Sequence, residues 1–498
     1  MIQFVIWLLL SFSCWSLNPS MIETQKAVAK ATHELSLMLE RQPSKKLHRY
    51  ETRIETRAKS GIALEWLVRQ QGETRCYWAV PDEYCLAGVG IAEMFHGKKN
   101  LPRRIFRRAS RLPQGAYFIG GQRFDFESEK RSKEWEAFND YCMILPRIVL
   151  EQTKNGELLL ACHTRAQDIV ETKQLLEKSA LSYLKEINCS TNEQIIVKET
   201  VPSRLEWKLI VKHFLLSPQV DKVVPARRRQ FQSAKIDPWR VLTALEAQPG
   251  TCEHCYRFGL QLQDNNATFF GASPELLCAI ENDNQLRCDV LAGTRPRKRN
   301  LYEDEALGAE LLDSAKDALE NDIVTHFVRR RLKHLAHNIT ISHVHIIKLA
   351  TVQHLRRQVI AYLRPKVRIR TVINALHPTP ATLGSPKLQA TTFLRKHEPF
   401  DRGWFAGPFG ILGRKRGTKK SSAIFAVAIR SALISSKHIF AYAGAGLVAG
   451  SDPNHEADEV DAKLKPIHHA LIQQAVSSSE KEGGLDHTTI TTLSSEEE

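Results

Sequence analysis

Two ionisable side chains in this 498-residue chain are flanked by residues that would shift their pKa values. Lys222 precedes two valines in a segment expected to form a strand with an apolar face, and a lysine held there has a lowered pKa and can act as a base. Glu275 stands between Pro274 and two leucines, and burial would keep its carboxyl group protonated, as a general acid requires. The alternatives are an exposed lysine at a strand end and a glutamate at a helix start.

A run of small residues, LAGTRPR, occupies positions 291–297 and is flanked by cationic side chains. We expect a turn here, with the backbone N–H groups of Gly293 and Thr294 exposed. Such groups can bind an anion. An ordinary turn without a ligand is the alternative.

Carboxylates gather on two expected helices. Asp317 and Glu320 are three residues apart, so a helix places them on one face. After a glycine-rich turn, Glu456, Glu459 and Lys463 fall at i, i+3 and i+7, again on one side of a helix. An all-oxygen set from two helices suits Mg²⁺ better than zinc. The alternative is two helix faces whose charges are exposed to solvent.

The elements that must position these residues alternate short apolar segments with turns that contain glycine and proline. In the first half we expect a helix over 166–187 and strands over 62–68, 75–80, 85–95, 115–124, 157–162 and 195–197. In the second half we expect a helix over 303–337 and strands over 423–434 and 438–443. This mixture predicts an α/β or α+β fold.

The ends of the chain differ from its body. Residues 4–17 are apolar but shorter than the roughly 20 residues of a transmembrane helix. Residues 1–20 are therefore a possible leader, with an N-terminal strand or a true start at Met21 as alternatives. Residues 21–60 read as a polar connector or a surface helix, and 477–498 as a disordered tail. No later segment is apolar enough to span a membrane, so we expect no membrane insertion of the body.

The charge balance is unusual, because 70 lysines and arginines against 55 acidic residues leave a net charge of +15. Such a surface attracts anions, which include nucleic acids, phospholipids and small acidic metabolites. A basic cluster, RRIFRRAS at 103–110, would suit a nucleic-acid patch, but a solvated face is the favoured interpretation since Phe106 is its one aromatic residue. No phosphate-binding loop of a nucleotide enzyme is present.

The 10 cysteines are too sparse for a disulfide scaffold, which favours a reducing compartment. The pair Cys252 and Cys255 has CxxC spacing but no second pair at zinc-finger spacing. Two ordinary thiols are therefore favoured over a metal or redox site.

Taken together, the motifs of the second half resemble those of the chorismate-utilising enzymes. The resemblance covers about residues 205–470, in the order KVVPAR (222–227), FFGASPELL (269–277), LAGTRPR (291–297), LLDSAKDALE (311–320), HPTPATLGSP (377–386), EPFDRGWFAGPFG (398–410), FAVAIRSALI (425–434) and GAGLVAGSDPNHEADEVDAK (444–463). It implies two face-packed antiparallel sheets, helices outside and the active site in the cleft. Residues 61–200 would form the variable N-terminal half and 201–473 the chorismate-binding portion.

Two positions indicate the branch that the chain resembles. In the family, the position of Lys222 is a lysine where water is the nucleophile and typically a glutamine where ammonia is used. The position of Ala292 is a lysine in the aminodeoxychorismate synthases, where it supplies a covalent nucleophile. The pair points to isochorismate synthases, with salicylate synthases as the nearest alternative.

The resemblance also implies a role for each motif residue. Lys222 would be the base that activates water for attack at C2 of chorismate, and Glu275 the acid that protonates the departing C4 hydroxyl. Mg²⁺ would be held by Glu320 and Glu459, with Glu456 and Asp317 nearby. The substrate carboxylates would be bound by Gly293 and Thr294 on one side and by Arg430, Lys463, Gly444 and Gly446 on the other.

His377 is a further family position near the substrate ring, and we expect it to support the substrate rather than catalyse. Its alternative role is to orient the turn at 378–380. Ala457 and Val460 depart from the family, which often has tryptophan and threonine there. They flank Glu456 and Glu459 without replacing them.

The activity implied is the Mg²⁺-dependent conversion of chorismate into isochorismate, for menaquinone or phylloquinone synthesis. The resemblance implies a monomer without an amidotransferase subunit and without nucleic acid as a partner. A quinone pathway and an apolar leader point to a plastid, with a bacterial cytoplasm as the alternative. Hypotheses of another class are a basic binder of nucleic acid or membrane surfaces and a degenerate family member.

Overall fold

The computed structural model describes residues 19–56, 61–184, 195–233, 236–263, 267–281, 284–418 and 420–476. Of the possible leader at 1–20, residues 1–18 therefore lie outside the described residues, as does the expected tail at 477–498. Among the described helices, none is both long and apolar enough to cross a membrane.

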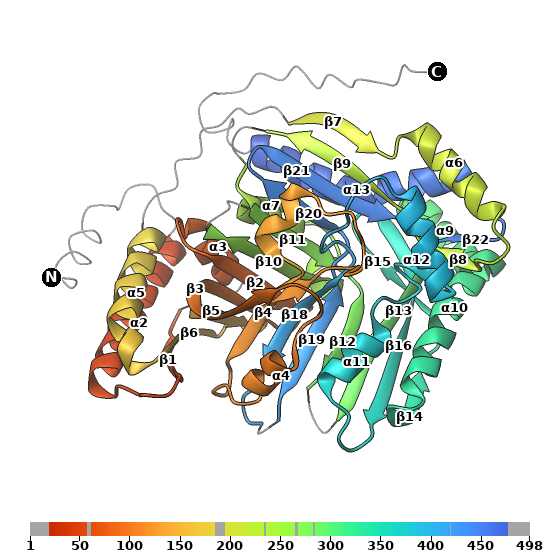
Figure 1. Cartoon of the computed structure of the whole chain (residues 1–498). Coiled ribbons are helices and arrows are strands. Elements are labelled where there is room, and N and C mark those ends of the chain that lie inside the picture. Colours follow the sequence, from red (N-terminus) through yellow and green to blue (C-terminus); the bar gives the residue numbers. More distant parts are fainter. Residues whose placement is uncertain are drawn as a thin grey trace, which may run out of the picture.

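A long strand, β5 (Tyr141–Thr153), joins two antiparallel arms of the sheet (Figure 1). One arm runs in the order β3 (Tyr84–Gly97), β2 (Arg75–Val80), β10 (Tyr256–Leu262), β11 (Ala267–Ser273), β20 (Ser431–Ser435), β21 (His438–Gly444), β9 (Ala226–Gln232) and β7 (Ile196–Val201).

The other arm runs in the order β4 (Tyr117–Gln122), β18 (Pro408–Gly413), β19 (Ser422–Val427), β12 (Leu276–Ile280), β13 (Gln285–Pro296) and β16 (Val352–Leu363). Strands β14 (Ala336–Ile341) and β15 (His345–Lys348) both pair with β16, while β6 (Leu158–Thr164) and β1 (His48–Ile54) extend the sheet beyond β5.

Aromatic side chains fill the space between the two arms. The ring of Phe409 on β18 stacks on Phe258 of β10 at 4.7 Å between centroids and on Trp78 of β2 at 6.3 Å. These side chains are almost completely buried, and stacked rings add to the free energy gained by removing their surface from water. The two arms therefore pack face to face, which confirms the fold expected from the motifs.

Helices cover the outside of the arms (Figure 1). Their bounds are α2 (Pro19–Arg41), α3 (Ile62–Arg69), α4 (Arg103–Ala109), α5 (Ile169–Leu184), α6 (Arg204–Leu215), α7 (Pro238–Glu246), α8 (Thr251–His254), α9 (Leu301–Asp313), α10 (Ala315–Leu332), α11 (Ile369–Leu376), α12 (Lys387–His397) and α13 (Pro453–Val476), with 3₁₀ turns at Lys133–Phe138 and Ala166–Asp168. Helix α10 packs on β13, and α13 packs on β21 and α7.

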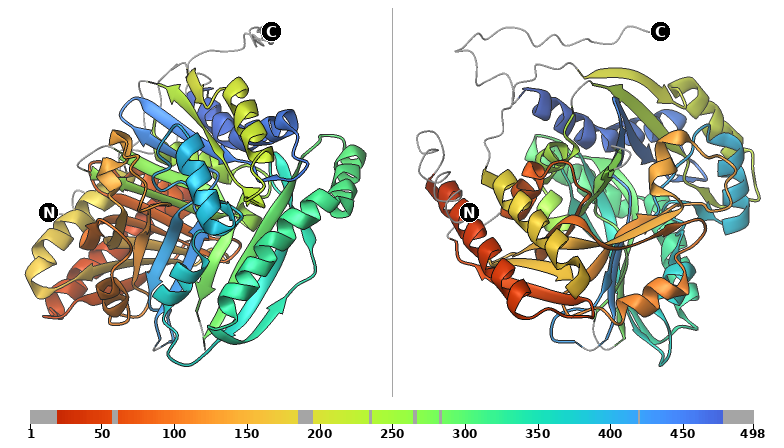
Figure 2. Two further views of the ribbon diagram at one scale, coloured as in Figure 1. Left: turned by 45° about the vertical axis from the view of Figure 1, so that its right-hand side comes forward. Right: turned by 60° about the vertical axis from the view of Figure 1, so that its left-hand side comes forward.

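Two expectations for the N-terminal half were wrong. Residues 62–68 form helix α3 and not a strand, because the run is buried on nearly all sides and its apolar pattern cannot separate the two. Of the two alternatives for residues 21–60, the connector is wrong and a helix is present: α2 buries Val28, Leu35 and Leu39 in the core, and β1 pairs with β6. Figure 2 shows α2 (red) beside α5 (yellow), which close this end of the molecule.

Two long segments of the second half are divided. The expected helix over 303–337 becomes α9 and α10, separated at Ser314, whose hydroxyl oxygen accepts a hydrogen bond from the N–H of Asp317 and caps α10. The expected strand over 423–434 becomes β19 and β20. Arg430, between them, has a φ of 50°, in the left-handed region that ends a strand.

Candidate active site

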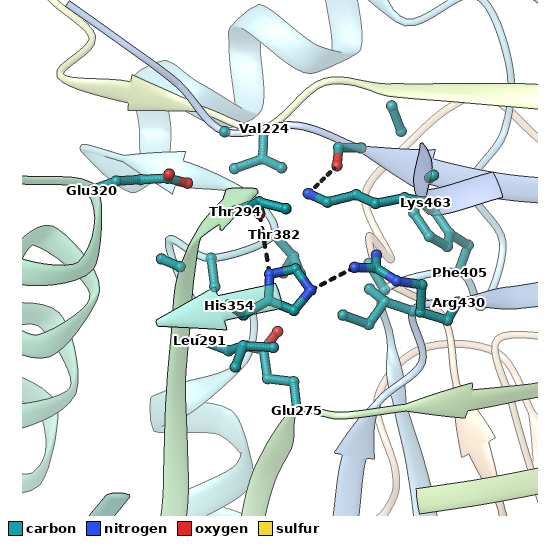
Figure 3. A pocket seen from close by; sticks show the side chains of 18 of the residues that line it. Val224, Glu275, Leu291, Thr294, Glu320, His354, Thr382, Phe405, Arg430 and Lys463 are labelled. Carbon is teal, nitrogen blue, oxygen red and sulfur yellow. Dashed lines mark hydrogen bonds between the residues drawn. The ribbon is translucent and has the colours of Figure 1, made fainter. Parts of the chain in front are cut away.

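A cavity lies between the two arms, where loops and two helices converge (Figure 3). It is lined by Val224, Ala226, Glu275, Leu291, Ala292, Gly293, Thr294, Glu320, His354, Ala381, Thr382, Arg402, Phe405, Ala406, Ile429, Arg430, Ala443, Gly444, Gly446 and Lys463. The lining includes the cationic side chains of Arg402, Arg430 and Lys463, and its apolar side chains are small or aliphatic apart from the ring of Phe405. The cavity thus suits a small anion with an apolar ring.

Lys222 is held directly behind the cavity wall. It lies on β8 (Lys222–Val223), which pairs with β17 (Gly384–Ser385) and β22 (Leu447–Val448) in a small separate sheet. Its side chain is fully buried, and its Nζ atom lies 3.1 Å from Oε1 of Glu320, which does line the cavity. Instead of the apolar face that we expected, the structure gives this lysine a carboxylate partner.

Glu320 projects from α10 toward that lysine. Burial by itself raises the pKa of Glu320, but Lys222, Lys463 and Lys316 outweigh it, so the net pKa lies below its usual value. Gly446 leaves room for the carboxylate, because a Cβ atom at this position would lie 2.0 Å from Oε1 of Glu320. The glycine is therefore required by a close approach to the functional group.

Glu275 meets the requirements of a general acid. It lies between β11 and β12, is 2% exposed, and its Oε1 atom has no hydrogen-bond partner among the described residues. Burial and the neighbouring carboxylate of Asp289 raise the pKa of Glu275 to about 8, although Lys222 and Arg430 oppose the shift. Near neutral pH the side chain therefore carries a proton that no described group accepts.

The anion-binding wall is built differently from the turn that we expected at 291–297. Gly293 and Thr294 lie inside strand β13, at a shift of its register with β16 between Leu291 and Thr294. Gly293 has a φ of +90°, which favours glycine, and this bulge turns backbone toward the cavity. The expected turn is therefore a β-bulge, and both of its residues line the cavity.

Arg430 and Lys463 face this strand from the other wall (Figure 3). Burial lowers the pKa of Arg430 to about 10, which still leaves its guanidinium charged at neutral pH. The Nζ atom of Lys463 donates to the carbonyl oxygen of Gly444 at 3.0 Å and to Oε1 of Glu459 at 2.5 Å. Two fixed cations therefore stand where a carboxylate of a ligand could bind.

Carboxylates from α10 and α13 share a neighbouring cation, because Glu456, Glu459 and Glu320 all raise the pKa of Lys316. Glu456 is 2% exposed and pairs with Lys316 at 2.5 Å. Burial, and then the negative charge of Glu459, raise the pKa of Glu456 to about 7. Among the described residues, no three acidic, cysteine or histidine side chains gather as a metal site. Each of Glu320, Glu456 and Glu459 pairs with a lysine.

The comparisons with known proteins agree with this geometry. A family model described as "Chorismate binding enzyme" matches residues 31–472. This chain belongs to the chorismate-binding enzymes. The match begins within α2 and takes in the N-terminal strands, so the first half is part of the family's fold as well.

Relatives among the chorismate-binding enzymes come from bacteria and plants. The chain is 33% identical to the salicylate biosynthesis isochorismate synthase of Pseudomonas aeruginosa, over 80% of this chain and 85% of that protein. It is 31% identical to the chloroplastic isochorismate synthase 2 of Arabidopsis thaliana, over 78% and 71%. Its fold matches the menaquinone-specific isochorismate synthase MenF of Escherichia coli with a TM-score of 0.74, 24% identity, and coverage of 89% and 100%.

The structure brings together most of the residues expected in the site of a chorismate-binding enzyme. Those that line the cavity are Glu275, Gly293, Thr294, Glu320, Arg430, Gly444, Gly446 and Lys463. Three more expected residues stand behind this lining. Lys222 contacts the lining residue Glu320, and Glu459 contacts the lining residue Lys463. Glu456 pairs with Lys316, which does not line the cavity. Asp317 instead pairs with Arg295 at 2.9 Å.

His377 does not line this cavity. Its ring lies in a neighbouring cavity beside Phe124, and Nε2 lies 3.1 Å from the carbonyl oxygen of that residue. Burial lowers the pKa of His377 to about 3, so the ring is neutral. The substrate-supporting role expected for His377 therefore stays a prediction, and its contact with Phe124 fits the alternative role of orienting the adjoining turn.

Two side chains of the cavity escaped the sequence analysis. His354 comes from the middle of strand β16, where an isolated histidine among alternating residues carries no signal of function. Arg402 belongs to the motif at 398–410, and its guanidinium donates to the carbonyl oxygens of Val224 and Thr382 and pairs with Glu398. A charged residue within this motif is the sequence feature that could have indicated a role for Arg402 in the site.

Proposed function

We propose that the chain is an isochorismate synthase, which converts chorismate into isochorismate by adding water at C2 and releasing the C4 hydroxyl. The observation that carries this proposal is the buried, protonated carboxyl group of Glu275 in the cavity. Glu320, which pairs with Lys222, and the cations Arg430 and Lys463 line the same cavity. Water attack needs a base and hydroxide loss needs an acid, and one side chain of each kind is present.

Substrate binding would divide the two carboxylates of chorismate between the walls. Arg430 and Lys463 would hold the enolpyruvyl carboxylate, and backbone at Gly293 with the hydroxyl of Thr294 would hold the ring carboxylate. This arrangement fixes the ring over the small side chains between the walls. It therefore sets the orientation of C2 and C4 toward the two catalytic groups.

The reaction moves two protons. As the base, Lys222 would accept at Nζ a proton of the water molecule that attacks C2. Glu275 donates its carboxyl proton to the C4 oxygen, which leaves as water, and the ring double bonds shift accordingly. Atoms and charge balance, because one water enters and one leaves.

We propose Glu320, Glu456 and Glu459 as the residues that hold Mg²⁺. The supporting observation is electrostatic: the buried Glu456 and its neighbour Glu459 repel each other, and a divalent cation would relieve this repulsion. Gly446 also leaves space around Glu320 that a side chain would fill. When bound, the cation would neutralise the ring carboxylate and withdraw electron density from the diene.

Incubation of the purified chain with chorismate and Mg²⁺ tests the proposal directly, with the products separated by chromatography. Isochorismate is the expected product. Salicylate with pyruvate, formed without a second enzyme, would instead identify a salicylate synthase. Absence of turnover with Mg²⁺ present and the fold intact would contradict both activities.

We further propose a plastid location and a role in menaquinone or phylloquinone synthesis. Support comes from relatives named as chloroplastic in Arabidopsis thaliana and Catharanthus roseus, and from the apolar residues 4–17. Relatives from bacteria include the isochorismate synthase MenF of Bacillus subtilis, which favours the bacterial alternative. Fractionation of cells that express the full-length chain with a C-terminal tag separates the two locations.

A further inference from the structure

A basic groove lies around α4 and α11, away from the catalytic cavity. Its lining includes the charged side chains of Arg103, Arg107 and Arg368 and the apolar side chains of Ile280, Leu363 and Val367. None of these residues lines the catalytic cavity. The groove therefore gives a structural place to the basic cluster at 103–110, which the proposed reaction does not use.

The arginines of α4 divide between two tasks. Arg108 makes an ion pair with Glu93 at 2.8 Å, and Arg104 lies over the ring of Phe95, so these two hold the helix to β3. Arg103 and Arg107, four residues apart, instead face the groove. One side of helix α4 is thus held to β3, and the other side places two arginine side chains in the groove.

The groove carries an excess of positive charge without counter-ions. Arg103, Arg107 and Arg368 are exposed, and within the described part of the chain no carboxylate lies within 4.0 Å of them. The carboxylate that lines the groove, Glu281, is already paired with Arg287 at 2.9 Å and with Lys415 at 2.8 Å. The rim therefore attracts an external anion.

The floor of the groove is apolar and recessed. Ile280 is 7% exposed and Leu363 is 4% exposed, while Phe106, Val367 and Ile369 are half-buried. A bilayer cannot reach a recessed floor, and a nucleic acid would gain little from aliphatic side chains since its bases stack on aromatic rings. A side chain that projects from a protein segment can reach it.

We propose that this groove docks an acidic segment of a partner protein. The carboxylates of the segment would pair with Arg103, Arg107 and Arg368 at the rim, and an apolar side chain between them would contact Val367 and Ile369 on the floor. Arginine is well suited to this task because its guanidinium binds carboxylates in a bidentate manner. The interface would be small and transient.

Fluorescence anisotropy with defined peptides tests the proposal on the full chain. The first probe is a fluorescein-labelled peptide in which single leucines separate pairs of glutamates, and the second has the leucines replaced by serines. The groove variant is Arg103→Glu with Arg368→Glu. The matched control, Lys26→Glu with Lys30→Glu, makes the same change of charge on two exposed lysines of α2.

The leucine-containing peptide is expected to bind the wild-type chain and the control, and to bind the groove variant at least about tenfold more weakly, or about 1.4 kcal/mol. The serine peptide should bind more weakly than the leucine peptide, since it cannot use the floor. Equal binding by the groove variant and the control would overturn the proposal. Equal binding of both peptides, or tighter binding of a single-stranded oligonucleotide or an anionic vesicle, would overturn it as well.

Discussion

The Nε2 atom of His354 lies 2.8 Å from Nη2 of Arg430, so the imidazole ring accepts a hydrogen bond from the guanidinium. The other ring nitrogen, Nδ1, therefore carries the proton and can donate to Oγ1 of Thr294 at 3.1 Å or to the carbonyl oxygen of Gly293 at 3.3 Å. Burial and Arg430 hold the pKa of His354 well below its usual value. A neutral histidine thus connects the two anion-binding walls.

His354→Ala should therefore weaken substrate binding more than turnover. Removal of the ring leaves the buried Arg430 without its acceptor and frees its guanidinium to move. We expect the KM for chorismate to rise about tenfold or more, with a smaller change in kcat, in steady-state assays. His326→Ala is the matched control, because that ring is exposed on α10. An equal rise of KM in both variants would contradict the assigned position of His354.

Glu275 should make both activity and stability fall as the pH rises through its pKa. Activity needs its carboxyl proton, so kcat/KM should fall as the pH rises through about 8. Because its pKa is higher in the folded chain than in the unfolded one, protonation contributes stability that is complete below about pH 4.5 and is lost as the pH rises through about 8.

Glu275→Gln should lower kcat by about 10²- to 10⁴-fold, because the amide cannot donate the proton. It should also remove the loss of stability that the wild type shows as the pH rises through about 8. Thermal unfolding measured at pH 6 and at pH 9 checks the second effect, since the difference in Tm between the two should be smaller in the variant than in the wild type. A variant with normal turnover, or with the same dependence of Tm on pH, would refute the assigned protonation state.

Lys222→Ala should lower the turnover by about 10²- to 10⁴-fold, because it removes the proposed base. No other lysine of the described residues forms an ion pair with Glu320 that could replace it. The substitution also leaves the Glu320 carboxylate buried without that cation, so a lower Tm is expected. Lys212→Ala, at an exposed position on α6, is the matched control and should leave both quantities unchanged. Near-normal kcat in Lys222→Ala would exclude this lysine as the base.

Gly446→Ala should disable the site by steric displacement of a carboxylate. The added Cβ atom would lie 2.0 Å from Oε1 of Glu320 and 3.1 Å from Cε of Lys222, so both side chains must move. We expect a loss of turnover of at least about tenfold, with far-ultraviolet circular dichroism like that of the wild type. Unchanged activity would mean that the position of Glu320 does not matter for the reaction.

Loss of Mg²⁺ binding is expected when the acidic pair that would hold the ion is neutralised. Glu320→Gln and Glu459→Gln should each weaken Mg²⁺ binding at least about tenfold in isothermal titration calorimetry, since each removes a charged oxygen ligand. Asp458→Asn is the control on the same helix, because its carboxylate is exposed and pairs with Arg204. Equal affinities in all three variants would place the ion elsewhere.

The short motifs of the sequence selected residues that the fold brings together around one cavity. The motifs predicted the acid at 275, the lysine at 222, and the cations at 430 and 463, because each stands in a short segment of fixed residue types. The same motifs predicted two face-packed sheets. By contrast, the strand expected at 62–68 is a helix, since a run buried on nearly all sides has no period that separates the two structures.

The sequence by itself determined which groups this protein has available and where the cationic and acidic residues lie along the chain. The tertiary structure decided their partners: Lys222 meets Glu320, His354 supports Arg430, and His377 turns away toward Phe124. It also decided that the arginines of α4 open onto a groove. The reason is that side-chain partners are set by the packing of strands distant in sequence, which local patterns of residues do not encode.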